Sequence, residues 1–435
     1  MFKTIGSAFK NPEIRKKILI TLLLLLIYRL GCYLPIPGLV PSVYKDVIAD
    51  NSTGLLGLMN AVTGSALANG AFFALGVTPY INASIIVQLL TVGIPALERL
   101  SKQGDDGRQK INLITKIVAL VLAIVQGVGI VLGFGIDKVH AIFGADLQWL
   151  AAVLVIVILV AGSCFTMWIG DKITEQGIGN GLSLIIFVGI ISTAGLGIVN
   201  SISQIFAGVT TAIWELLGFL ALAFVLFALI VFVDLAERKI PVQYAKQVKG
   251  RKMYGGQSSY IPMKVNASGV MPIIFATAII TFPSIIMQLC GVEAGDGWFA
   301  DFWYNYLGTG TVVYSILVSL LILFFAYFYA QIQFNPADVS MNIQQNGGFI
   351  PGIRPGKPTT EYLSKVSKRI TLFGAIFLAF LTVVPNIVFK LVAGGSLGLL
   401  NAFTATGMLI VVSCAIEFNT QLDAQLMMRA HKNIL

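Results

Sequence analysis

A series of long apolar runs constrains this chain more than any other feature. Residues 113–133 give the clearest example, because Lys116 is their only charged side chain. A helix needs about 20 mostly apolar residues to cross a bilayer. Only 11% of the residues in the whole chain are charged, against about a quarter in soluble domains. Most of this chain is therefore expected to lie in lipid.

Apolar runs bounded by charged or Pro/Gly-rich breaks predict ten transmembrane helices. The first run is long enough to span the membrane, so we expect a retained helix rather than a cleaved signal peptide. The predicted fold is an all-α polytopic membrane protein. Its predicted spans are residues 18–34, 73–92, 113–133, 149–169, 182–199, 214–233, 270–290, 311–331, 370–389 and 397–416.

Basic residues are distributed very unevenly between the two sides of this arrangement. Of 29 Lys and Arg residues, 25 lie on the side of the termini and only Lys45, Lys138 and Lys390 lie on the other. Loops rich in Lys and Arg remain cytoplasmic, so both termini are predicted to be cytoplasmic. Arg29 falls near the outer end of the first span, where its side chain is expected to reach toward the lipid headgroups.

The ten spans divide into two groups of five. The predicted halves are residues 1–200 and 201–435, and the basic loop at 234–269 follows the first span of the second half. An odd number of spans gives the halves opposite topology, which suits an inverted repeat with a functional path between its halves. The halves share no clear sequence identity, so this prediction rests on topology alone.

Residues 51–71 break the pattern. They read NSTGLLGLMNAVTGSALANGA, too polar and glycine-rich for a span yet apolar enough to be buried. One interpretation is a loose loop on the outer side. The other is a short re-entrant helix, which is tolerated at membrane depth where protein covers it or where it lines a cavity.

Side chains suited to catalysis or ion coupling are scarce. The chain has two histidines, and its four cysteines are far apart without a C-x-x-C pair, which argues against a metal site and against histidine catalysis. The spans contain almost no acidic or basic residues, whereas ion-coupled transporters usually keep such groups deep in a span. The sequence thus disfavours an enzyme and a secondary transporter with inverted repeats.

Two long loops concentrate basic residues. In the loop at 234–269, Ile240, Val242 and Tyr244 alternate as in a strand, and residues 249–252 read KGRK, which predicts a charged turn. The loop at 332–369 is rich in Pro and Gly and contains Arg354. Topogenic charge explains the sign of both loops. A long, structured, basic protrusion additionally favours docking of an anionic partner such as RNA or an acidic protein.

Several motifs resemble the SecY/Sec61-alpha family, and the bacterial members more than the archaeal or eukaryotic ones. The resemblance extends over nearly the whole chain. It is carried by LPIPG (34–38), FALGVTPYINASIIVQLL (73–90), GRQK (107–110), ITEQGIGNGLSLIIF (173–187), KVNASGVMPIIFA (264–276) and GGFIPGIRPGKPT (347–359).

The resemblance implies an hourglass-shaped channel whose waist is closed by six aliphatic side chains, the pore ring. Leu182 stands where bacterial relatives usually have isoleucine. Residues four apart share a helix face, a spacing that ordinary helix packing also produces. The implied pore-ring positions are Ile81, Ile85, Leu182, Ile186, Ile274 and Ile410.

The resemblance also implies a plug and a lateral exit toward lipid. The plug corresponds to residues 54–69, and Gln88, Gln126 and Thr277 are implied to line the exit. The implied plug positions begin with Gly54, Leu55, Leu56, Gly57, Leu58, Met59, Asn60, Ala61, Val62, Thr63 and Gly64.

The docking positions implied by the resemblance are Arg238, Lys239, Arg251, Lys252 and Arg354. The implied partners are the SecA ATPase, the ribosome with its RNA, the small membrane subunits SecE and SecG, signal sequences, secretory polypeptides and membrane lipid. A Walker A motif is absent from the sequence, so the energy has to come from such a partner. No enzymatic activity and no cofactor are implied, and the implied location is the bacterial plasma membrane.

Overall fold

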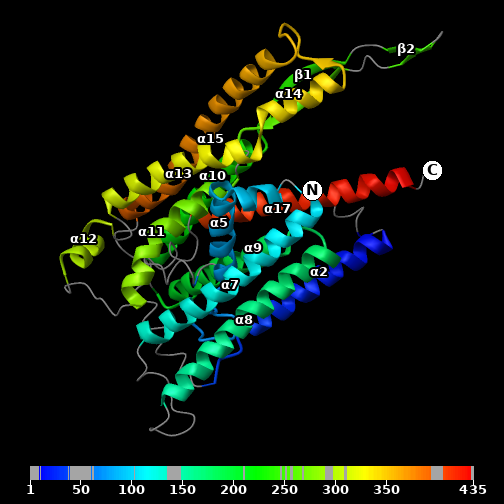
Figure 1. Cartoon of the computed structure of the whole chain (residues 1–435). Coiled ribbons are helices and arrows are strands. Elements are labelled where there is room, and N and C mark those ends of the chain that lie inside the picture. Colours follow the sequence, from blue (N-terminus) through cyan, green and yellow to red (C-terminus); the bar gives the residue numbers. More distant parts are fainter. Residues whose placement is uncertain are drawn as a thin grey trace. The chain divides into compact units, whose positions relative to one another are not determined.

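Figure 1 shows the chain in a computed structural model, as long helices with a small strand-containing region. Contacts divide the chain into two compact units, one of residues 1–220, 278–311 and 393–435 and one of residues 221–277 and 312–392. The predicted halves at 1–200 and 201–435 stay a prediction. The structure describes residues 9, 11–37, 39, 60, 63–101, 103–134, 148–208, 211–244, 247–249, 252–254, 258–266, 269–289, 297–307, 311–392 and 405–432.

Each of the ten predicted spans overlaps one described helix. In the first unit these are α2 (Pro12–Gly31), α5 (Thr78–Gly93), α7 (Asp105–Phe134), α8 (Gln148–Gln176), α9 (Gly181–Phe206) and α17 (Ala405–Lys432). The boundaries between the two units fall within two more helices, α10 (Thr211–Asp234) and α11 (Met271–Leu289). The second unit contains α13 (Val312–Gln333) and α15 (Lys357–Val392). The described residues also form three short helices, α6 (Pro95–Ser101), α12 (Trp298–Tyr306) and α14 (Pro336–Gln345).

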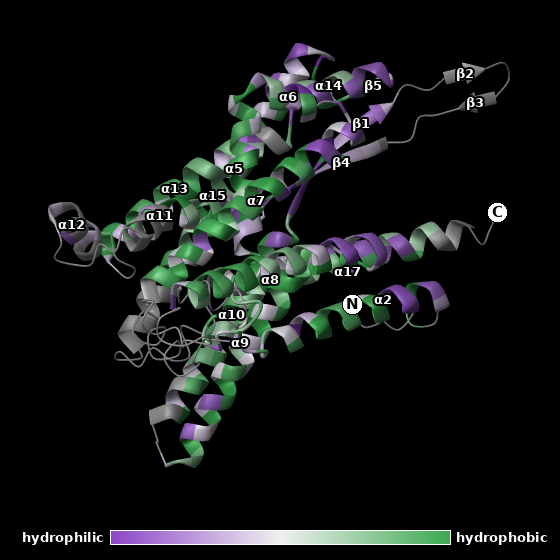
Figure 2. Cartoon of the chain, turned by 60° about the horizontal axis from the view of Figure 1, so that its bottom comes forward, coloured by the Kyte–Doolittle hydropathy of each residue, from purple (hydrophilic) through white to green (hydrophobic). Residues whose placement is uncertain are grey.

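Length and composition make many of these helices suitable for a bilayer. Six described helices are long and apolar enough to cross a membrane, or seven if the bent pair α5–α6 is one span. The bend between α5 and α6 is 105° and falls at Ile94 and Pro95, because a residue before proline is disfavoured in the α region. In Figure 2 the helices are hydrophobic over most of their length, and hydrophilic residues gather over β1, β5 and α14.

In the first unit, α2, α8 and α9 pack against one another and hold the segment 63–77. A row of aromatic rings links α2, this segment and α8. The Tyr28 and Phe73 centroids lie 5.4 Å apart, and Phe73 lies 6.0 Å from Phe165, which stacks on Trp168 at 5.4 Å. Aromatic pairs at these separations stabilise beyond their buried area. Phe73 is therefore an anchor for the segment that carries it.

The LPIPG motif pairs with the end of the same segment. The Ile36 amide donates to the Gly70 carbonyl over 2.8 Å, and the Phe72 amide donates to the Leu34 carbonyl over 2.9 Å. Pro35 and Ala71 form the β-bridge between these two bonds. The motif thus satisfies backbone groups that would otherwise be costly to bury.

Gly162 on α8 leaves room for the backbone of this segment. A Cβ at position 162 would overlap the Phe72 carbonyl oxygen, whereas a Cβ at Gly127 on α7 would lie 3.5 Å from its nearest neighbour. We expect Gly162→Ala to destabilise the protein by about 1–3 kcal/mol through overpacking. Gly127→Ala should instead be neutral or stabilising, because alanine favours helix by up to ~1 kcal/mol. Thermal unfolding of both variants in detergent checks this, and equal melting temperatures would contradict it.

The second unit contains a small sheet at the end of its helices. Strand β1 (Glu237–Tyr244) pairs antiparallel with β4 (Ser258–Lys264), and its other edge pairs with β5 (Gly348–Phe349). Ile240 and Val242 are buried while their neighbours are exposed, so the predicted alternation is confirmed. One face of the sheet packs on α14 and α15 through a core that includes Met263, Ile343, Ile350, Leu363 and Val366. Strands β2 (Gln247–Lys249) and β3 (Lys252–Tyr254) form a second hairpin.

Candidate pore and docking surface

Five of the six predicted pore-ring residues belong to the first unit. Ile81 and Ile85 lie on α5, Leu182 and Ile186 on α9, and Ile410 on α17. Ile81 and Leu182 pack against the same core cluster, which joins α2, α8, α9 and α17. Two side chains about 100 residues apart in sequence therefore pack on one cluster. Ile274 lies on α11 in the second unit.

Burial separates two of these positions, Ile410 and Ile274, from their neighbours. Ile410 is partly exposed within a run in which Met408, Leu409, Val411 and Val412 are buried. Ile274 is likewise partly exposed between buried neighbours. Such residues lie on a helix face that the described protein does not cover. Ile85 differs, because it is only 4% exposed.

The turn between α8 and α9 determines where Leu182 lies. Asn180 caps α9, and its side-chain oxygen accepts from the Leu182 amide over 3.1 Å. The Leu182 side chain lies over Gly170 of α8, where an added Cβ would come within 2.6 Å of Leu182 Cδ2. The Gly181 amide donates to Thr174 Oγ1 over 2.9 Å. The EQGIGNG motif thus joins α8 to α9 by a closely packed turn.

This turn is also tied to α2. The Ile178 amide donates to Thr21 Oγ1 over 3.2 Å, and Ile178 is buried with Ile14, Ile18 and Leu422. The start of α2, the α8–α9 turn and the C-terminal part of α17 therefore share one core. This core therefore supports the two helices, α9 and α17, that carry three of the predicted pore-ring residues.

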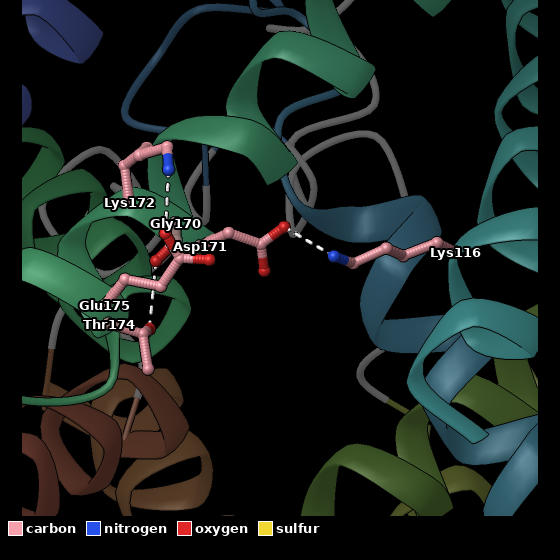
Figure 3. Close-up of polar contacts among 6 residues, drawn as sticks. All are labelled: Lys116, Gly170, Asp171, Lys172, Thr174 and Glu175. Carbon is pink, nitrogen blue, oxygen red and sulfur yellow. Dashed lines mark hydrogen bonds and ion pairs between the residues drawn. The ribbon is translucent and has the colours of Figure 1, made fainter. Parts of the chain in front are cut away.

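Figure 3 shows the polar contacts beside this turn. Lys116 on α7 forms an ion pair of 2.7 Å with Asp171 on α8, and both side chains are partly exposed. Exposed pairs contribute about 0–1 kcal/mol, so the pair positions two helices more than it stabilises them. Lys172 donates a hydrogen bond of 2.7 Å to Glu175, three residues along α8. The sequence marked Lys116 as an isolated charge but did not indicate its partner.

The predicted lateral-exit residues differ in how their polar atoms are used. The side-chain oxygens of Gln88 on α5 and Gln126 on α7 are buried without a hydrogen-bond partner among the described residues. Leaving such an atom unpaired costs about 1–3 kcal/mol. The Thr277 hydroxyl on α11 donates to helix carbonyls, that of Ile273 over 2.9 Å and that of Ile274 over 3.1 Å.

The predicted plug falls partly outside the described residues. Of positions 54–64, the structure describes Asn60, Thr63 and Gly64. Residues 63–70 form consecutive turns, with Thr63 and Gly64 buried. Asn60 organises these turns, because its backbone carbonyl accepts from the Ser65 amide over 2.8 Å and its side chain accepts from the Ala68 amide over 3.0 Å.

The predicted docking residues of the 234–269 loop lie on its strands. Arg238 and Lys239 are exposed on β1. The Lys239 ammonium lies 4.8 Å from the centre of the Tyr260 ring and 3.3 Å from the Glu237 carboxylate. Lys252 begins β3 and pairs with Lys249 of β2, which places two basic residues opposite each other across the predicted turn. Arg251 lies outside the described residues.

Arg354 is exposed on a turn whose backbone is fixed. Its carbonyl accepts from Thr359 Oγ1 over 2.8 Å, and the Gly356 carbonyl accepts from Ser340 Oγ over 3.0 Å. The neighbouring Ile353 packs against the core beneath the sheet. Arg354 and Arg238 are therefore presented by one packed region, although they come from two loops.

Comparisons with known proteins identify the family of this chain. A family model described as SecY matches residues 71–419. The protein translocase subunit SecY of Streptomyces coelicolor is 40% identical over 449 residues, which cover 100% of both chains. A solved SecY, whose plug domain is reported to stabilise the closed state of the translocation channel, has a TM-score of 0.63, with 19% identity and 96% of each chain covered. Sec61 from a canine ribosome–channel complex has a TM-score of 0.58, with 18% identity and 96% of each chain covered. The chain belongs to the SecY family of multi-pass membrane proteins.

Proposed function

We propose that this chain is the central subunit of a protein-conducting channel in the bacterial plasma membrane. It passes unfolded secretory polypeptides across the membrane and releases transmembrane segments sideways into lipid. The observation that carries the proposal is the SecY family match together with the apolar side chains at the predicted waist. Ile81, Leu182, Ile274 and Ile410 are uncharged, branched and partly exposed. A constriction lined by hydrocarbon excludes water and ions by dewetting.

Such a waist suits a substrate of variable sequence. Aliphatic side chains make no directional bonds, so they can contact many different polypeptide segments without holding any of them. The chain has no Walker A motif, and we assign the driving force to the SecA ATPase or the translating ribosome. SecE and SecG are the proposed small membrane partners.

The exposed basic residues of the strand-containing region form the proposed docking surface for SecA or ribosomal RNA. Arg238, Lys239 and Arg354 support this proposal, because they are exposed on backbone that a packed core fixes. The uneven distribution of basic residues supports a topology with this surface and both termini in the cytoplasm.

Crosslinking of a translocating chain tests the proposed path. A single cysteine at Leu182, in a background without the native cysteines, should form adducts with a secretory polypeptide arrested during SecA-driven export. Ile191 is the matched control, because it lies nine residues along α9, on the opposite face, and is 44% exposed. Adducts at Leu182 should exceed those at Ile191 by about tenfold, since a narrow waist surrounds its contents. Equal yields, or transport of small solutes only, would contradict the proposal.

A further inference from the structure

Arg29 is a charged residue inside the first span, and charges at membrane depth are costly and usually functional. The sequence predicts that its side chain reaches toward the headgroups. In the structure the Arg29 side chain is half-buried and bonded to neighbouring protein groups. Its guanidinium donates to the Gly64 carbonyl over 3.3 Å, to the Tyr33 hydroxyl over 3.3 Å and to Ser192 Oγ. It also lies 5.4 Å from the centre of the Tyr33 ring. Arg29 therefore connects α2, α9 and the segment at Gly64.

The segment that Arg29 contacts is held close to α9. A Cβ added to Gly64 would come within 3.0 Å of Gly189 Cα on α9 and would overlap the Arg29 guanidinium. Gly64 has a φ of +68°, and so does Ser65, which is the non-glycine residue with positive φ in the described part of the chain. A serine in this region is unfavourable and persists where surrounding contacts hold it. The segment thus depends on its neighbours for its conformation.

The chemistry of these contacts suits a reversible hold. The partners of Arg29 are a backbone carbonyl and two hydroxyl groups, and no ion pair to it is found in the part of the chain that the structure describes. Charge-assisted hydrogen bonds are stronger than bonds between neutral groups. Water can replace neutral acceptors when the segment moves away, whereas separating a buried ion pair leaves an uncompensated charge. Breaking these three hydrogen bonds therefore leaves neutral acceptors, which water can satisfy.

We propose that Arg29 is a positioning residue that holds residues 63–65, which lie within the predicted plug at 54–69, on α9 while the channel is closed. This rests on the proposed function, because a plug has meaning only in a channel. When a secretory polypeptide displaces the plug, the Gly64 carbonyl and Ser192 hydroxyl exchange the guanidinium for water. The C-terminal anchor at Phe73 stays in place, so the segment moves about that anchor.

The test uses the full-length chain in sealed vesicles and measures ion efflux and backbone hydrogen exchange. Arg29→Met should raise the ion leak and the exchange rate of residues 63–71 by about tenfold or more, the effect of losing one charge-assisted hydrogen bond. Arg29→Lys keeps the charge without the forked donor geometry. Its ion leak and exchange rate should lie between those of the unmodified protein and those of Arg29→Met. Ser192→Ala should leak less than Arg29→Met. The double variant should leak no more than Arg29→Met alone, because both changes remove the same contact.

The outcomes separate this inference from the channel proposal. Unchanged exchange at residues 63–71 in Arg29→Met would overturn the inference, and so would exchange that rises equally throughout α2, α8 and α9, which indicates a general structural role. Ile274→Asn is measured in parallel as a leak standard. A leak from Ile274→Asn with sealed Arg29→Met vesicles refutes the role of Arg29 and leaves the channel intact. If neither variant leaks, the channel proposal fails.

Discussion

Ile274→Asn is expected to convert a sealed channel into one that leaks ions in the absence of any partner. Moving an amide from water into hydrocarbon costs about 4 kcal/mol or more, so an asparagine at the waist favours a wetted state to a similar extent. Ion conductance of vesicles containing the variant should rise by at least about a hundredfold. Export of precursors with defective signal sequences should rise as well, because a wet waist opens more easily. Ile410→Asn should behave in the same way from α17.

Two controls separate the waist from the rest of α11. Ile274→Leu keeps the volume and the hydrocarbon surface and should remain sealed. Ile279→Asn makes the same chemical change five residues along the helix, at a position that is 42% exposed and on a different face. It should lower stability without conducting ions. An unchanged leak in Ile274→Asn, or an equal leak in Ile279→Asn, would refute the predicted ring.

Arg354→Glu is expected to abolish motor-driven export while the protein still folds. The side chain is exposed, and the Arg354 carbonyl rather than its guanidinium forms the bond to Thr359, so folding does not depend on its charge. Breaking a charge pair in an interface costs about 2–5 kcal/mol, and reversal adds repulsion. SecA-stimulated translocation into vesicles should therefore fall by about a hundredfold or more.

Lys357→Glu provides the matched control for this reversal. Lys357 is exposed three residues away at the first position of α15, where a carboxylate is favoured by the helix dipole. The Lys357→Glu variant changes the net charge by the same amount as Arg354→Glu. Retained export in Lys357→Glu would assign the effect to Arg354 itself. Equal losses in both variants would mean that the overall charge of the loop matters and that Arg354 is not a specific contact.

Hydropathy predicted the presence and order of the helices. A helix forms all its backbone hydrogen bonds within one segment, so a long apolar run in lipid is expected to be helical. It did not predict where they end. The span at 370–389 belongs to α15, which begins at Lys357, and the span at 113–133 belongs to α7, which begins at Asp105. Polar residues continue a helix beyond the membrane as readily as apolar ones, so hydropathy marks the part in lipid and not the whole helix.

Contacts between distant segments could not be predicted from local patterns. The alternation at Ile240 and Val242 predicted β1, because one face of a strand packs and the other is solvated. No pattern indicated that β5, about 100 residues later, would pair with it. The hydrogen-bond partner of Arg29 could not be predicted either, because Ser192 is 163 residues away. Such contacts depend on tertiary packing, which periodicity and composition do not record.

The pairing of β1 with β5 has a consequence for the order of biosynthesis. β1 lies between β4 and β5, and β5 consists of residues 348–349. Because a chain is made from its N-terminus, β1 and β4 exist about 100 residues of synthesis before the sheet can acquire its third strand. The docking surface that we propose includes Arg354, which follows β5 in the sequence, so this surface is complete only late in synthesis.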